Sequence, residues 1–155
     1  MLRNKKASAL TLFLSTLLLT SMLLFGVVNC STSNTSVSSV LFINEFMADN
    51  GITVAGPDGN SPDWIELYNA GTETIDLTGM YLTDNLNNPT RWQFPEDTTI
   101  GPKEYLIVWA ARNGGELYAT FGLDANGEEI GLFDSDGVTL IDSVTYVKQI
   151  QDVSY

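Results

Sequence analysis

The sequence predicts an all-β domain built as a sandwich or a barrel. Short runs rich in β-branched and aromatic residues recur about every ten positions along residues 40–155. Gly, Asn, Asp and Pro separate these runs, and no stretch sustains the apolar period of an amphipathic helix. Short strands at regular spacing, with turn signals between them, are typical of two packed antiparallel sheets or of a closed barrel.

Eight strands are predicted from these runs. In chain order they span residues 40–47, 63–69, 74–83, 91–94, 105–110, 117–121, 129–134 and 139–147. The turns between them have a physical basis, because Gly accepts the positive φ that tight turns require. Asp134-Ser135-Asp136-Gly137 predicts a hairpin, Asp124-Ala125-Asn126-Gly127 predicts a similar turn, and Ile100-Gly101-Pro102-Lys103 is a further break.

Alternation along 63–69 separates two faces of the second strand. Ile65 and Leu67 lie on one face, while Trp64, Glu66 and Tyr68 lie on the other. An antiparallel strand needs only one apolar face in the core, so we expect Ile65 and Leu67 to be buried.

Three further positions have a structural reading. Asn69 ends its strand before Ala70-Gly71 and is expected to bond nearby backbone as a turn former. Phe94 and Trp109 are expected to be buried, because aromatic side chains dominate the core of a small sandwich.

The polar, Gly-rich segment 48–62 is predicted to be a long loop, either functional or merely mobile.

Charge and composition exclude several classes of function. The 155 residues include 19 acidic and 7 basic side chains, no His and one Cys, and the formal net charge is −12. A surface this acidic repels phosphate, so we expect no nucleic-acid partner. His and Cys are the commonest groups of acid/base, nucleophilic and zinc chemistry, and their scarcity argues against an enzyme.

The first thirty residues are predicted to be an export signal. Arg3, Lys5 and Lys6 precede 22 residues without a charge, at 7–28. A run of this length also suffices to cross a bilayer, so an uncleaved span is an alternative. In both cases the remainder of the chain is expected to be exported.

Cys30, the only cysteine, follows this apolar run. Val27-Val28-Asn29-Cys30 resembles a bacterial lipoprotein lipobox, although Asn29 departs from the small residue usual at that position. The resemblance implies lipidation of Cys30 and a lipid-anchored protein of the cell envelope. Cleavage near Cys30 without lipidation and a retained anchor are the alternatives. The Ser/Thr-rich segment 31–39 then predicts a flexible tether.

Six motifs over about 110 residues, in order and spacing, resemble the lamin tail domain. They are Leu41-Phe42-Ile43-Asn44-Glu45-Phe46, Asp63-Trp64-Ile65-Glu66-Leu67-Tyr68-Asn69, Leu77 with Gly79, Met80 and Leu82, Trp92-Gln93-Phe94-Pro95, Ile107-Val108-Trp109-Ala110, and Glu128-Glu129-Ile130-Gly131-Leu132 with Asp142-Ser143-Val144. The resemblance implies an immunoglobulin-like β-sandwich over residues 40–155, of a kind found in nuclear lamins and in many exported bacterial proteins.

The C-terminus departs from the family pattern. Exported relatives run on into one further segment, and Asp152-Val153-Ser154-Tyr155 resembles its start. We therefore expect a domain that is short at its C-terminus and lacks its last strand, with unpaired backbone at a sheet edge.

Two features suggest binding or chemistry. Trp64 and Tyr68, which point outward on the same strand, suggest a stacking platform for a sugar ring or a partner, and cover by a neighbouring loop is the alternative. Glu45, Asp63 and Glu66 suggest a paired acid/base site, which the small size of the domain disfavours.

No cofactor is expected, and calcium is the weak exception. Asp58, Asn60 and Asp63, with Asp49 and Asn50 nearby, supply oxygens in an irregular loop, although their spacing matches no EF-hand. A looser second set is equally well explained as turn residues: Asp124, Asn126, Asp134 and Asp136.

The function these observations favour is a non-catalytic, membrane-tethered interaction module that binds a protein or glycan at the cell envelope, through the 48–62 loop or the Trp64/Tyr68 face. The alternative is an accessory module of an exported enzyme system, serving substrate targeting or stabilised by calcium.

Overall fold

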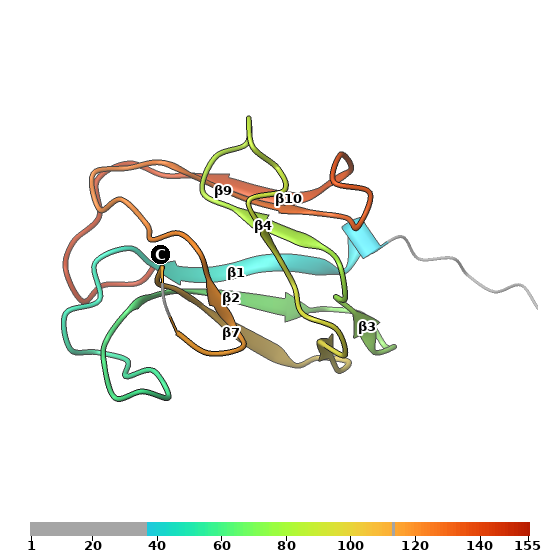
Figure 1. The fold of residues 1–155 in the computed structure, drawn as a ribbon, viewed down its shortest axis with the longest axis horizontal. Coiled ribbons are helices and arrows are strands. Elements are labelled where there is room, and N and C mark those ends of the chain that lie inside the picture. Colours follow the sequence, from blue (N-terminus) through green and yellow to red (C-terminus); the bar gives the residue numbers. More distant parts are fainter. Residues whose placement is uncertain (1–36, 113) are drawn as a thin grey trace, which may run out of the picture. The chain divides into compact units, whose positions relative to one another are not determined.

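The computed structural model describes residues 37–112 and 114–155, which form a β-sandwich (Figure 1). Among these residues the one helix is a three-residue 3-10 turn, η1 (Val37–Ser39). The predicted all-β class and sandwich architecture are therefore confirmed.

Two four-stranded sheets form the sandwich. The first has the order β1-β2-β7-β8, the second β10-β9-β4-β5, and β3 pairs with β6 in a small third sheet. The strands are β1 (Leu41–Met47), β2 (Asp63–Asn69), β3 (Ile75–Asp76), β4 (Tyr81–Thr83), β5 (Trp92–Gln93), β6 (Thr99–Ile100), β7 (Tyr105–Ala110), β8 (Tyr118–Ala119), β9 (Glu129–Phe133) and β10 (Leu140–Thr145).

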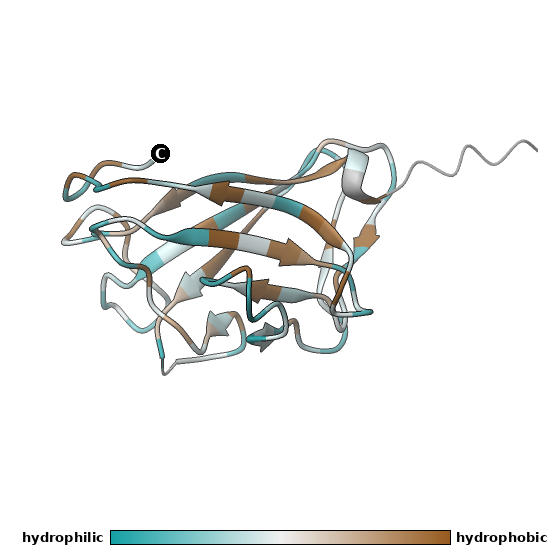
Figure 2. Cartoon of the chain, turned by 90° about the horizontal axis from the view of Figure 1, so that it is seen from above, coloured by the Kyte–Doolittle hydropathy of each residue, from teal (hydrophilic) through white to brown (hydrophobic). Residues whose placement is uncertain are grey.

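The core lies between the two large sheets. Hydrophobic and hydrophilic bands alternate along the strands, because successive side chains point to opposite faces (Figure 2). The largest fully buried side chains come from both sheets and the loops: Phe46, Phe121, Leu41, Ile65, Leu67, Leu77, Leu82, Ile100, Ile130, Leu132 and Val108. The predicted burial of Ile65, Leu67 and Phe94 is confirmed.

The single predicted strand 74–83 is wrong, because it is two short strands in different sheets. β3 pairs with β6, whereas β4 pairs with β5 and β9. Between them Gly79 adopts a φ of 79°, and the amide of Met80 donates to the carbonyl of Leu77 at 3.0 Å. This turn moves the chain from one sheet to the next.

Other boundaries also differ from those predicted. The strand expected at 117–121 is reduced to β8, which runs parallel to β7, and β6 was not predicted at all. At the end of the predicted tether, Val37 packs half-buried against the core, and the amide of Val40 donates to its carbonyl at 3.0 Å. The packing of the Val37 side chain thus holds η1 against the domain. The rest of the tether lies outside the described residues.

The two predicted aspartate-glycine turns are confirmed. In each, the glycine amide donates to the carbonyl of the first residue, from Gly127 to Asp124 at 3.0 Å and from Gly137 to Asp134 at 2.9 Å. Both glycines have positive φ, 114° and 69°. The 48–62 loop contains no strand, as predicted.

The outer edge of β1 is occupied at two residues. Phe46 and Tyr155 exchange backbone hydrogen bonds at 3.0 and 2.9 Å. Further along, the amide of Ile43 donates to Oδ2 of Asp142, a side chain of β10, at 2.8 Å. The expectation of unpaired backbone is therefore not met at Phe46 or at the Ile43 amide.

Candidate functional site

The candidate site is the outer face of the first sheet, where β1, β2 and β7 lie side by side (Figure 1). Their antiparallel register places side chains in rows across the three strands. One row holds Met47, Trp64 and Trp109, the next Glu45, Glu66 and Ile107, and the third Phe42, Tyr68 and Tyr105.

Trp64 points outward as predicted, but it is not available as a platform. It is only 5% exposed and belongs to a second apolar cluster with Met47, Trp109 and Tyr118. Val54, from the 48–62 loop, packs against this cluster. The loop therefore covers part of the cluster that buries Trp64, which corrects the predicted Trp64/Tyr68 platform in favour of the alternative of loop cover. Trp109 is buried as predicted, although in this outer cluster and not between the sheets.

The accessible aromatic row is Phe42, Tyr68 and Tyr105, which we call the aromatic ridge. Phe42 is 38% exposed, Tyr105 is 56% exposed and Tyr68 lies half-buried between them. Of the three, only Tyr68 was singled out from the sequence. Phe42 and Tyr105 become neighbours of Tyr68 through strand pairing alone.

The rings of Tyr68 and Tyr105 stand upright on the sheet. Their centroids are 4.6 Å apart, and the rings are stacked with an interplanar angle of 24°. Because neighbouring strands are about 4.8 Å apart, rings that stack face to face at this separation must project away from the sheet. The pair therefore presents a ridge of ring edges and hydroxyls and not a flat surface for a sugar ring.

Two carboxylates lie beside the ridge. Glu45 is directly opposite Glu66 in the β1–β2 register, and both are half-buried. A register shift between Ile43 and Glu45 leaves Asn44 as an extra residue in β1, a β-bulge. The side-chain amide of Asn44 donates to Oε1 of Glu66 at 2.9 Å and so holds that carboxylate in place.

Asp63 does not join these two glutamates. It lies at the far end of β2, and its Oδ1 accepts the amide of Asn50 at 3.1 Å. Burial raises the pKa of Asp63, and the hydrogen bond from the backbone amide of Asn50 opposes that rise. The three carboxylates suggested as an acid/base site therefore do not converge.

The sequence model of the Lamin Tail Domain matches residues 34–148, which is well over half of the chain. The chain belongs to the lamin tail domain family. No curated protein matched the sequence. The predicted resemblance is thereby confirmed, and lamin tail domains are non-enzymatic, immunoglobulin-like interaction domains. The outer face of this lamin tail domain is thus a candidate interaction surface.

The calcium candidates of this lamin tail domain bond to their own neighbours. Asp58 accepts from the amide and side chain of Asn60, at 3.1 and 2.7 Å, and from the hydroxyl of Tyr118 at 3.2 Å. These hydrogen bonds lower the pKa of Asp58, that to the Asn60 side chain most. Within residues 37–112 and 114–155 no three acidic, His or Cys side chains gather as metal ligands.

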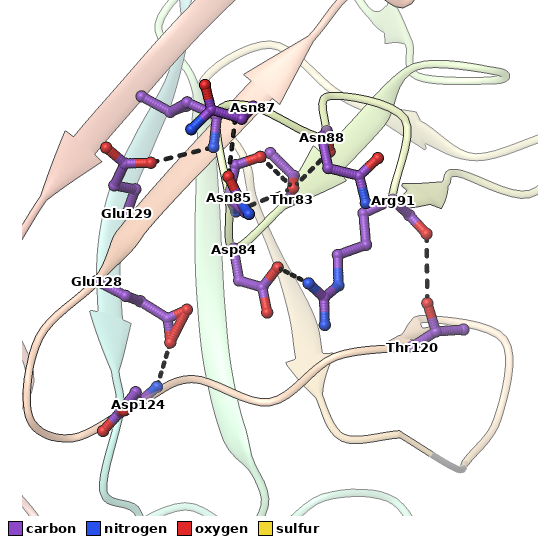
Figure 3. A network of polar contacts seen from close by, with 11 residues as sticks. Thr83, Asp84, Asn85, Asn87, Asn88, Arg91, Thr120, Asp124, Glu128 and Glu129 are labelled. Atoms are coloured by element: carbon purple, nitrogen blue, oxygen red, sulfur yellow. Dashed lines mark hydrogen bonds and ion pairs between the residues drawn. The ribbon is translucent and has the colours of Figure 1, made fainter.

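A second group of carboxylates lines a shallow pocket away from the aromatic ridge. Asp84, Asp124 and Glu128 line it together with Arg112, and Asp84 forms a 2.8 Å ion pair with Arg91 (Figure 3). Burial raises the pKa of Asp84, and the Arg91 charge opposes that rise. Burial also raises the pKa of Glu128, and the charges of Asp84 and Asp124 add to the rise.

Glu128→Gln is expected to stabilise the domain at pH 7. The raised pKa of Glu128 means that the folded state favours the protonated carboxyl, so its ionisation lowers stability as pH rises above the ordinary value of about 4.3. Gln keeps a side-chain oxygen that can accept the hydrogen bond from the backbone amide of Asp124, as Oε1 of Glu128 does in the structure. Urea unfolding at pH 7 should show a higher midpoint for the variant, and the gain should shrink towards pH 3.

Glu96→Gln serves as the control for Glu128→Gln. Glu96 is exposed in a loop, and its substitution removes the same charge from the protein. An equal gain from Glu96→Gln would attribute the effect to net charge and contradict the local explanation.

Cys30 and the predicted export segment lie outside the described residues. Within the part of the chain that the structure covers, no helix has the length and apolarity needed to span a bilayer.

Proposed function

We propose that this lamin tail domain is a membrane-tethered module of the cell envelope that binds a protein partner through the aromatic ridge. The observation that carries the proposal is the row of three neighbouring aromatic side chains, two of them exposed, on a paired sheet face. Tyr and Phe are enriched where proteins bind one another, because they bury large area at a small entropic cost.

A protein partner suits the ridge better than a glycan does. Sugar rings stack on flat aromatic faces, and Tyr68 and Tyr105 turn faces towards each other. Upright rings with accessible hydroxyls instead fit between the side chains of a protein surface. The three strands hold them on regular backbone, so little order is lost on binding.

Export and tethering rest on the residues before the domain. A basic start, an uncharged run at 7–28 and Cys30 at its end support lipidation at that cysteine. The acidic charge of the chain supports a role that involves no nucleic acid.

Site-specific photocrosslinking tests the ridge. A photoreactive phenylalanine at Tyr105 is expected to give a discrete protein adduct in cells of the source organism, and Tyr68→Ala should abolish that adduct. The same probe at Val138, which is 78% exposed on the β9–β10 hairpin, is the control. Equal adducts from both positions, or none from Tyr105, would contradict binding through the ridge.

Intact mass of the membrane fraction tests the tether. We expect a chain that begins at Cys30 with a diacylglyceryl increment, and loss of that increment in Cys30→Ser. A wild-type chain without the increment, whether cleaved or uncleaved, would contradict lipid anchoring.

A further inference from the structure

We propose that the aromatic ridge and the Glu45/Glu66 pair form one docking surface for a protein segment that carries arginine. The guanidinium would bind the two carboxylates and lie against the tyrosine rings. This inference rests on the proposed function, because it names the chemistry of the partner at the same surface.

The Glu45/Glu66 pair places two like charges opposite each other on neighbouring strands. Glu45 and Glu66 are register partners on neighbouring strands and project to the same outer face. Like charges directly opposite each other in an antiparallel pair destabilise the sheet. Local departures from good sheet chemistry, with no gain within the fold, are typical of binding sites.

No ion pair to Glu45 or Glu66 forms within the described part of the chain. The ion pair found there joins Arg91 to Asp84, in the pocket network of Figure 3. The ammonium of Lys103 donates a hydrogen bond to the carbonyl of Ala70. Neither Glu45 nor Glu66 forms an ion pair within residues 37–112 and 114–155, so both carboxylates are available to the cation of a partner.

The bulge in β1 arranges the acceptor. Bulges add a residue to one strand and re-aim its side chains, and they are over-represented near functional sites. Here the extra residue, Asn44, donates to Oε1 of Glu66 at 2.9 Å, and the following residue, Glu45, pairs with Glu66. The amide fixes one carboxylate and leaves its second oxygen free of that bond.

The ridge lies within reach of a cation bound to the pair. Tyr68 follows Glu66 by two residues on the same face of β2, a separation of about 6.6 Å along a strand. Because Tyr68 turns a face to Tyr105, a cation held by the glutamates meets ring edges and hydroxyl oxygens at the ridge, and these oxygens can accept from its N–H groups. The half-buried Ile107 completes the Glu45/Glu66 row with an apolar surface.

Arginine fits this surface better than lysine. Its planar guanidinium donates to two carboxylate oxygens at once and has further N–H groups for the tyrosine hydroxyls. The lysine ammonium is a compact, strongly hydrated charge that offers neither geometry. An acidic or phosphorylated partner is disfavoured by the two carboxylates.

The test measures binding of a fluorescent (Arg-Gly)4 peptide to the full chain in detergent micelles, with a (Gln-Gly)4 peptide as the uncharged comparison. The arginine peptide is expected to bind and the glutamine peptide is not. Glu45→Gln/Glu66→Gln should weaken binding about tenfold, which corresponds to about 1.4 kcal/mol. Tyr105→Leu, which removes a hydroxyl acceptor and keeps an apolar side chain, should weaken it about threefold.

A charge-matched variant separates this site from general attraction between a basic peptide and an acidic protein. Glu96→Gln/Asp97→Asn removes two negative charges from an exposed loop, and Asn tolerates the φ of 62° found at Asp97. Its affinity should change by less than about twofold. Equal weakening in both double variants would overturn the inference.

Folding is checked with the same proteins. Glu45→Gln/Glu66→Gln removes a repulsion, so without peptide its thermal midpoint should equal or exceed that of wild type. The arginine peptide should raise the midpoint of wild type more than that of the double variant. A lower midpoint for the free variant would overturn the repulsion on which the inference depends.

The inference and the proposed function fail differently. If crosslinking through Tyr105 persists in Glu45→Gln/Glu66→Gln and the arginine peptide does not bind, the ridge binds a partner of other chemistry and only this inference is overturned. If a lysine peptide binds as tightly as the arginine peptide, the assignment to arginine is overturned. If the probe at Tyr105 gives no adduct in the otherwise wild-type chain, both this inference and the proposed function are overturned.

Discussion

Asn69→Asp is expected to destabilise the domain by about 3–5 kcal/mol, because it buries an uncompensated charge. Asn69 is fully buried. Its side-chain amide donates to the carbonyls of Glu73, Ile100 and Gly101 at 2.8–3.1 Å, and its oxygen accepts the amide of Gly71 at 2.8 Å. The aspartate would direct an oxygen at three carbonyls. Urea unfolding at pH 7 measures the loss.

Two comparisons make the Asn69 result specific. The defect of Asn69→Asp should lessen as pH falls, because a protonated carboxyl can again donate one hydrogen bond. Asn87→Ala, at an exposed position in another loop, should change stability by less than about 0.5 kcal/mol. A loss in Asn69→Asp no larger than that of Asn87→Ala would refute the role assigned to the side chain.

Trp64→Ala is expected to destabilise the domain by about 3–5 kcal/mol, as for other buried tryptophans. The indole packs with Met47, Trp109 and Tyr118 under the 48–62 loop. Its removal should also free Val54 and the surrounding loop, which hydrogen exchange would detect as faster exchange at 49–62. Thermal or urea unfolding gives the size of the effect.

Tyr105→Ala is the matched aromatic deletion on the same face. Because Tyr105 is 56% exposed, its loss should cost no more than about 1 kcal/mol. If Trp64→Ala were as stable as Tyr105→Ala, Trp64 would be a surface residue, as the platform hypothesis requires, and the loop cover would be wrong.

Much of the fold could be predicted from local sequence. Alternation in β2 identified the buried positions Ile65 and Leu67 and the outward direction of Trp64. The aspartate-glycine turns were predictable because their glycines meet a backbone requirement that few other residues satisfy. Gly79 gave the same kind of signal, but the apolar residues around it, Leu77 and Met80, read as one continuous strand although they belong to a turn between sheets.

The candidate site depended on information that no single strand contains. Phe42 and Tyr105 are ordinary strand residues until the register places them beside Tyr68. The bulge at Asn44 sets which residues of β1 share that face, and a slip of one residue would turn Phe42 into the core. Loop cover of Trp64 is likewise a tertiary effect, since alternation gives the direction of a side chain and not what lies over it.

The carboxylate of Asp142 on the Ile43 amide limits how the domain can recognise a partner. Many sheet proteins bind by β-augmentation, in which an extended peptide adds a strand along an open edge and reads mainly backbone. In β1 that route is blocked at Ile43 by a side chain and at Phe46 by Tyr155. On the β1 side of this sheet, contact with a partner would therefore fall to the side chains of the outer face, where substitutions leave the strand ladder intact.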